Sequence, residues 1–182
     1  MSEFILDIEQ IRKSARSQME KGAITQNYQA DRHAILKILD TALATEWICV
    51  LRYTQHAKSA QGLHAEPIAK HFAEHAKQEE GHANQLADRI KQLGGKPDLD
   101  PASFGRRSHT HYVECESLVD MIKENLIAER IAVDAYSAAI RFIGTTDPTT
   151  RRILESILEV EEEHADELAD LLAAFDPREP IN

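Results

Sequence analysis

Residues 79–88 read EEGHANQLAD, and residues 161–170 read EEEHADELAD. Both stretches fit the pattern Glu-Glu-x-His-Ala-x-x-Leu-Ala-Asp. In each copy the first Glu and the His are three residues apart, so on a helix they lie side by side on one face. These pairs are Glu79 with His82, and Glu161 with His164. A chain of this composition contains about one Glu-x-x-His by chance, so the repetition of the longer phrase carries more weight than either pair.

A second repeated segment lies upstream of each copy. It holds a Glu, two β-branched residues and a Tyr at identical spacing: Glu46, Ile48, Val50 and Tyr53, and Glu129, Ile131, Val133 and Tyr136. Glu46 precedes Glu79 by 33 residues, and Glu129 precedes Glu161 by 32. The chain therefore reads as two copies of one helical hairpin, whose equivalent residues would face each other about a pseudo-twofold axis.

Apolar residues at helical spacing predict an all-α fold, a four-helix bundle preceded by a leader helix. The long helices are expected at about 31–60, from after Gly62 to 93, 116–143 and 148–175, with Asp31 and Asp147 as N-caps. The connection over 95–115 is long enough to cross the length of the bundle. We expect three parts: a leader helix (about 3–20) and linker in 1–28, the bundle in 29–176, and a Pro-containing tail in 177–182.

Each predicted long helix carries one Glu on an otherwise apolar face: Glu46, Glu79, Glu129 and Glu161. Four buried carboxylates repel one another and are costly to bury without a cation between them. No Lys or Arg falls on these faces, and His82 and His164 adjoin two of the Glu residues. Two divalent metal ions would satisfy all six groups, and carboxylate with imidazole favours iron or manganese. The alternative to a metal site is that the two repeated stretches are acidic helices exposed to solvent.

Composition narrows the choice of partners. The net charge of −10 disfavours a nucleic-acid footprint and attracts cations. Four cations in the leader are weak support for DNA binding: Arg12, Lys13, Arg16 and Lys21. No apolar run approaches the ~20 residues that span a bilayer, so no membrane partner is expected. The N-terminus lacks a signal-peptide pattern, and two cysteines form no motif, which favours a reducing, cytoplasmic setting.

The residues as a set resemble the ferritin-like superfamily, closest to bacterioferritins and Dps-like ferritins with a bacterioferritin-type centre. The matching motifs span about 31–175: Glu46-(x)6-Tyr53-(x)2-His56-Ala57, Glu79-x-x-His82-Ala83, Glu129, and Glu161-x-x-His164. The resemblance implies a ferroxidase that holds two iron ions per subunit and oxidises Fe(II) with O2 or H2O2. It also implies a homo-oligomeric shell that stores ferric mineral and protects against oxidative stress. Tyr53 is a candidate catalytic residue, and a core tyrosine is its alternative.

This chain departs from the resembled family at three points. Glu80 stands where bacterioferritins carry a haem-ligating Met, so no haem is expected. No short fifth helix is expected in the tail, which favours a dodecamer over a 24-mer. Dps-like relatives often carry a cysteine pair near the centre, but Cys115 lies 14 residues from Glu129, or about 21 Å along a helix. A disulfide with Cys49 is therefore not expected.

Other candidates are weighed against ordinary structural roles. His75 lies one turn from Glu79 and gates iron entry, extends the centre or is a satisfied core histidine, while His71 and Glu74 face outward or toward a cavity. The acidic face that includes Glu167 is expected to be solvated, with guidance of iron as its alternative. A manganese catalase or rubrerythrin-like peroxidase is the enzyme alternative, and a DNA-binding Dps-like protein is the non-enzymatic one.

Overall fold

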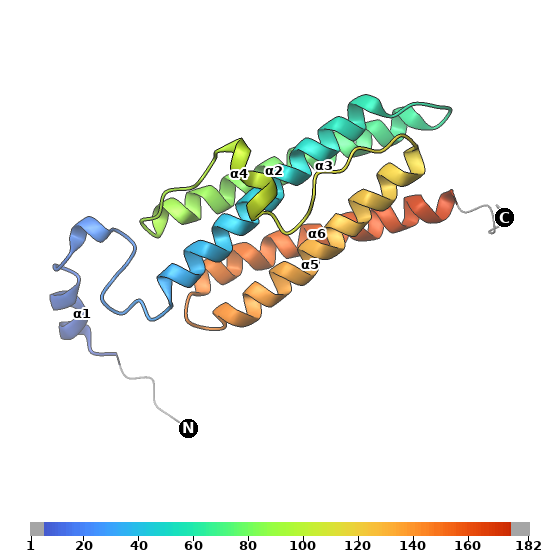
Figure 1. Cartoon of the computed structure of the whole chain (residues 1–182). Coiled ribbons are helices and arrows are strands. Elements are labelled where there is room, and N and C mark those ends of the chain that lie inside the picture. Colours follow the sequence, from blue (N-terminus) through green and yellow to red (C-terminus); the bar gives the residue numbers. More distant parts are fainter. Residues whose placement is uncertain (1–5, 176–182) are drawn as a thin grey trace, which may run out of the picture.

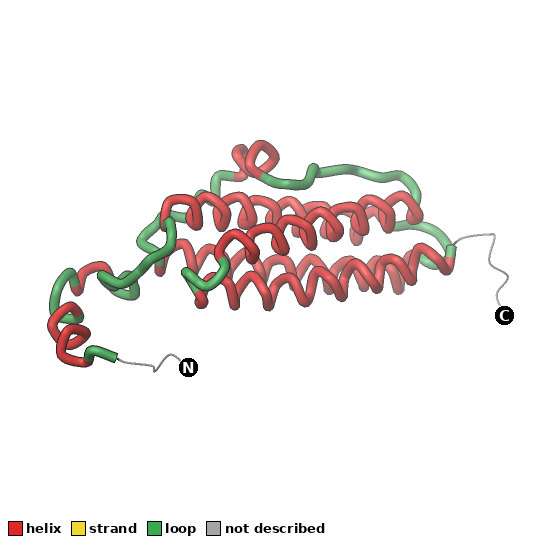
Figure 2. The backbone as a smooth tube through the Cα atoms, turned by 90° about the horizontal axis from the view of Figure 1, so that it is seen from below, coloured by secondary structure: helices red, strands yellow, loops and turns green. Residues whose placement is uncertain are grey.

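The computed structural model describes residues 6–175, and every regular element within them is a helix. The elements are α1 (Ile8–Ser14), the 3-10 helix η1 (Met19–Lys21), α2 (Arg32–Ser59), α3 (Ala65–Gln92), α4 (Pro101–Arg107), α5 (Leu118–Ile143) and α6 (Pro148–Ala174). Four of them are long and lie alongside one another (Figures 1 and 2). The all-α fold is confirmed, and no described helix is long and apolar enough to cross a membrane.

The bundle consists of two helical hairpins. Helix α2 packs along α3, and α5 packs along α6. Between the hairpins, the chain from α3 to α5 runs back along the length of the bundle, as Figure 2 shows. The predicted long crossover is therefore present, and it allows the second hairpin to face the first.

The crossover contains α4, a helix that the sequence analysis did not predict. Asp100 caps it by accepting a hydrogen bond from the backbone N–H of Ala102, and Pro101 occupies its first turn. The Phe104 ring stacks on Trp47 of α2, with ring centroids 6.2 Å apart. The N-cap Asp100, the first-turn Pro101 and the burial of Phe104 together explain why this segment is helical. With seven residues, the helix is too short to show a helical repeat of apolar residues in the sequence.

The leader is shorter than the expected helix over 3–20. Helix α1 ends at Ser14, and Gln18 adopts a left-handed φ of 55° just before η1. No residue of α1 is buried, and its apolar residues Ile8 and Ile11 are 44% and 38% exposed. The apolar face of α1 therefore has no partner within the described residues. The start of the expected leader, within residues 1–5, and the whole of the expected tail, 177–182, lie outside the described residues.

Two apolar clusters fill the bundle on either side of a polar layer. One holds Ile35, Leu39, Leu43, Leu86, Ile90, Leu154 and their neighbours, and the other holds Tyr53, Phe72, Met121, Ile122, Leu168 and theirs. Each large apolar side chain contributes about 1.5–3 kcal/mol on burial. These clusters offset the cost of the polar layer and keep water away from it.

Polar contacts define the helix ends. Asp31 and Asp147 accept hydrogen bonds from the backbone N–H groups of Ala34 and Thr150, at 3.0 and 2.9 Å, so both predicted N-caps are confirmed. Asp147 also forms a buried ion pair with Arg89 at 2.9 Å. This pair ties the start of α6 to the end of α3.

Candidate metal centre

The six predicted ligand residues meet in the polar layer. Glu46 comes from the middle of α2, Glu129 from α5, and the two Glu-His pairs from α3 and α6. Each of the six residues is at most 5% exposed. Helical spacing explains the arrangement, because every one of these residues lies on the face that its helix turns toward the core.

The six side chains form two overlapping groups of four. One group is Glu46, Glu79, His82 and Glu161, and the other is Glu79, Glu129, Glu161 and His164. Within each group the ligand atoms lie within 4.8 Å of one another. Glu79 and Glu161 belong to both groups. Each half of the site therefore has one imidazole, two carboxylates shared with the other half, and one carboxylate of its own, Glu46 or Glu129.

Both histidines present Nδ1 to the carboxylates. His82 Nδ1 lies 2.9 Å from Glu161 Oε1, 3.1 Å from Glu79 Oε2 and 3.5 Å from Glu46 Oε2. His164 Nδ1 lies 3.2 Å from Glu79 Oε1 and 4.0 Å from Glu161 Oε2. One nitrogen and several oxygens thus converge on a common point in each half.

Burial and mutual repulsion dominate the electrostatics. Burial, followed by the charge of Glu79, raises the pKa of Glu46 from 4.5 to about 8 and raises the pKa of Glu129 and Glu161. Burial would also raise the pKa of Glu79, but its close contacts with His164 and His82 outweigh burial and lower that pKa. In the same way, contacts with Glu46 and Glu79 overcome burial and raise the pKa of His82 to about 10.

Four buried atoms of the cluster have no properly oriented hydrogen-bond partner: Glu79 Oε1, Glu129 Oε2, Glu161 Oε1 and His164 Nδ1. Nearly all buried polar atoms in proteins have such a partner. His82 Nδ1 and Glu79 Oε2 form a hydrogen bond, but Glu79 Oε1 and Glu161 Oε1 lie 3.2 and 2.9 Å from a histidine nitrogen without forming one. This is expected of ligand atoms that point toward a shared metal position. A Glu from each of two helices with Glu-x-x-His from each of the other two fits two iron or manganese ions.

Two tyrosines orient Glu46 and Glu129, the carboxylates that belong to only one half of the site. Tyr53 of α2 donates a hydrogen bond to Glu129 of α5, and Tyr136 of α5 donates one to Glu46 of α2. Burial, followed by the neighbouring carboxylate charge, raises the pKa of both hydroxyls, so they remain donors. The crossed pairs are related by the pseudo-twofold symmetry that the sequence repeat indicates.

Arg52 is a buried cation that the sequence analysis missed, with 1% of its surface exposed. It does not contact the carboxylate cluster. Its Nε donates to Asn125 at 2.8 Å, and its Nη1 donates to Thr110 and to the carbonyl of His111. Asn125 also contacts His56, whose Nε2 lies 3.1 Å from the carbonyl of Val113. This network fixes the crossover to the bundle and gives His56 a structural role.

A family model described as a ferritin-like domain matches residues 36–176. This chain belongs to the ferritin-like family. It is 28% identical over 145 residues to the DNA protection during starvation protein of Pyrococcus furiosus, covering 78% of each chain. It is 27% identical over 146 residues to the bacterioferritin of Rhodobacter capsulatus, covering 78% of this chain and 84% of that one.

Among solved structures, the chain is similar to the bacterioferritin-related protein from Bacteroides fragilis, which is described as a dodecameric thioferritin. The two share 32% identity with a TM-score of 0.76, over 79% of this chain and 87% of the other. The resemblance to bacterioferritins and Dps-like proteins is confirmed. The metal-binding roles of the six residues, and the catalytic role of Tyr53, stay predictions.

Proposed function

We propose that this protein is a ferroxidase that oxidises Fe(II) at the six-residue centre and stores the ferric product inside a shell of its own copies. One observation carries the proposal: six buried side chains from four helices converge, and four of their atoms have no hydrogen-bond partner. Membership of a family that includes bacterioferritins supports iron as the metal.

The geometry supports a division of roles among the ligands. Glu79 and Glu161, which belong to both groups, would bridge the two metal positions, and Glu46 and Glu129 would each bind one. His82 and His164 would complete one position each. Tyr136 and Tyr53 hold the terminal carboxylates in orientation through their hydroxyls.

Two Fe(II) ions bound here as substrate would each give up one electron to a single oxidant molecule. With two protons, O2 would become H2O2, or H2O2 would become two molecules of water. The carboxylates stabilise the ferric product because they are hard, anionic oxygen ligands. Glu46, whose pKa is about 8, releases its proton as it becomes a ligand. The flanking apolar clusters exclude bulk water from the reacting metal ions.

Rapid-mixing measurements of Fe(II) oxidation test this function. Replacing a bridging ligand, Glu161→Ala, or an imidazole, His82→Ala, is expected to slow the rapid oxidation phase at least about 100-fold while the helical content stays unchanged. Glu162→Ala is the matched control, because this neighbouring side chain is exposed. Wild-type rates in the two ligand variants would overturn the assignment.

We propose a dodecamer as the shell. The relative from Bacteroides fragilis, described as dodecameric, supports this size. Mass measurement of the native assembly tests it, and a mass equal to twelve chains of 20.5 kDa is expected. A mass of twenty-four chains would refute the dodecamer and leave the centre unaffected.

A further inference from the structure

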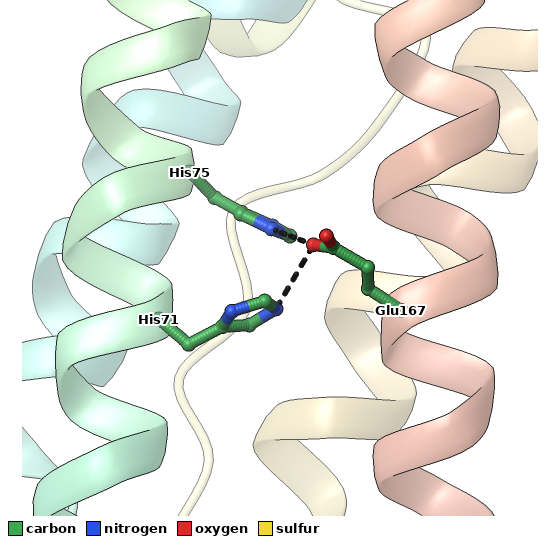
Figure 3. Close-up of side chains that lie close together, drawn as sticks. All are labelled: His71, His75 and Glu167. Atoms are coloured by element: carbon green, nitrogen blue, oxygen red, sulfur yellow. Dashed lines mark hydrogen bonds and ion pairs between the residues drawn. The ribbon is translucent and has the colours of Figure 1, made fainter.

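Three side chains outside the six-residue centre form a second candidate metal cluster. His71 and His75 lie one turn apart on α3, and Glu167 reaches them from α6, as Figure 3 shows. Glu167 Oε2 lies 3.0 Å from His75 Nε2 and 3.4 Å from His71 Nε2. The cluster lines a pocket that opens to solvent, since the Glu167 side chain is 54% exposed while that of His75 is only 2% exposed.

The spacing of these three atoms matches the edges of a metal coordination shell. Imidazole and carboxylate ligands lie about 2.0–2.2 Å from a bound divalent ion. Adjacent ligand atoms are then roughly 2.9–3.5 Å apart in octahedral or tetrahedral geometry. Both distances to Glu167 fall within this interval, and the open side of the pocket leaves room for water ligands.

Hydrogen bonding around the cluster also favours a cation between the imidazoles and the carboxylate. His71 Nε2 is buried and has no hydrogen-bond partner, because its contact with Glu167 lacks the required angle. His75 Nδ1 lies 3.1 Å from the Tyr53 hydroxyl, whose single proton is donated to Glu129. His75 must therefore donate from Nδ1, which turns the lone pair of a neutral ring at Nε2 toward the Glu167 carboxylate. Two acceptors 3.0 Å apart repel unless a cation lies between them.

We propose that His71, His75 and Glu167 form a third metal site, which binds a divalent cation such as Fe(II) or Zn(II). Two imidazoles and one carboxylate with open positions suit these ions. The His75 ring stacks on His164 at a centroid distance of 3.8 Å, so the site lies directly between solvent and the centre. The proton position assigned to His75 requires an ionised Glu129 and so rests on the proposed function, whereas the distances to Glu167 and the unpartnered Nε2 of His71 do not.

Zinc binding to the metal-free protein tests the site. Calorimetric titration with Zn(II) is expected to show one fewer ion per subunit in His71→Ala and Glu167→Gln than in the wild type. Anomalous diffraction at the zinc edge should place a peak at the cluster in the wild type and no peak there in His71→Ala or Glu167→Gln. Glu74→Gln is the matched control, because Glu74 lines the same pocket but pairs with Lys70 at 3.8 Å.

The third site would be overturned if the wild type and Glu167→Gln bind equal numbers of zinc ions and crystals of the wild type show no anomalous peak at the cluster. The positive charge beside Glu167 would then come from a protonated His75. The variant Glu161→Ala separates this result from failure of the main centre. It is expected to lose ions from the six-residue centre and to retain the one at His71 and His75. Loss of the zinc peak at the cluster in this variant would refute an independent third site.

Discussion

Replacing Glu46 by Gln is expected to stabilise the metal-free protein while removing metal binding. Glu46 is buried, and its pKa is raised from 4.5 to about 8 by burial and by the charge of Glu79. Its charged form is thus disfavoured in the folded state. Glutamine keeps an oxygen that can accept the hydrogen bond from Tyr136 and carries no charge.

The pH dependence follows from the sign of this pKa shift. An acid whose pKa is higher when folded costs nothing below pH 4.5, where both states are protonated. The cost grows as pH rises through the interval from 4.5 to about 8 and is complete above it. Each pH unit in that interval costs about 1.4 kcal/mol, so at pH 7 the penalty is about 3 kcal/mol. At pH 7, Glu46→Gln should recover most of this penalty, roughly 2–3 kcal/mol. The recovery is not complete, because the amide lacks the favourable contact of the carboxylate with His82.

Denaturant unfolding with a chelator present, at fixed protein concentration, measures this effect. The stability difference between Glu46→Gln and the wild type should grow from about pH 5 to about pH 8. Glu80→Gln is the control, since Glu80 is the exposed neighbour of Glu79, and it should change stability by less than about 0.5 kcal/mol. A Glu46→Gln variant less stable than the wild type at pH 8 would refute this account of the polar layer.

Three further outcomes are expected. Tyr53→Phe leaves Glu129 without its donor, so it should lower the free energy of unfolding by about 1–3 kcal/mol and slow Fe(II) oxidation; wild-type values for both would contradict the proposed orientation of Glu129. Asp147→Ala leaves the Arg89 guanidinium buried and unpaired, so thermal or denaturant unfolding should show a loss of about 3–5 kcal/mol, and a loss below 1 kcal/mol would count against the pair. Metal affinity should rise from about pH 6 to about pH 8, because binding displaces the proton of Glu46, and calorimetry in buffers of different ionisation enthalpy should detect that release; affinity independent of pH would be inconsistent with it.

Four long helices and the convergence of the ligand residues could be predicted from the sequence because both depend on helical spacing. A Glu on each apolar face must point into the core once the helices pack, whatever their exact angles. The internal repeat then aligns the two hairpins, and the N-caps Asp31 and Asp147 define two helix starts. Most of the fold and of the candidate site could therefore be predicted from helical spacing and from which residues must be buried.

What the sequence did not predict depends on tertiary contacts. Helix α4 covers seven residues, and its packing on Trp47 is visible only in three dimensions. Arg52 lies beside the apolar face of α2 and is buried because the crossover covers it. Glu167 was expected on a solvated face, but the rotation of α6 brings its carboxylate to His71 and His75. Interhelical register decides each of these cases.

The six-residue centre is expected to bind two iron ions. Crystals of the protein loaded anaerobically with Fe(II), measured at the iron absorption edge, test it most directly. Two anomalous peaks per subunit are expected within the polar layer, one beside His82 and one beside His164, with Glu79 and Glu161 contacting both. An absence of iron peaks in this layer, with iron bound only elsewhere on the subunit, would contradict it.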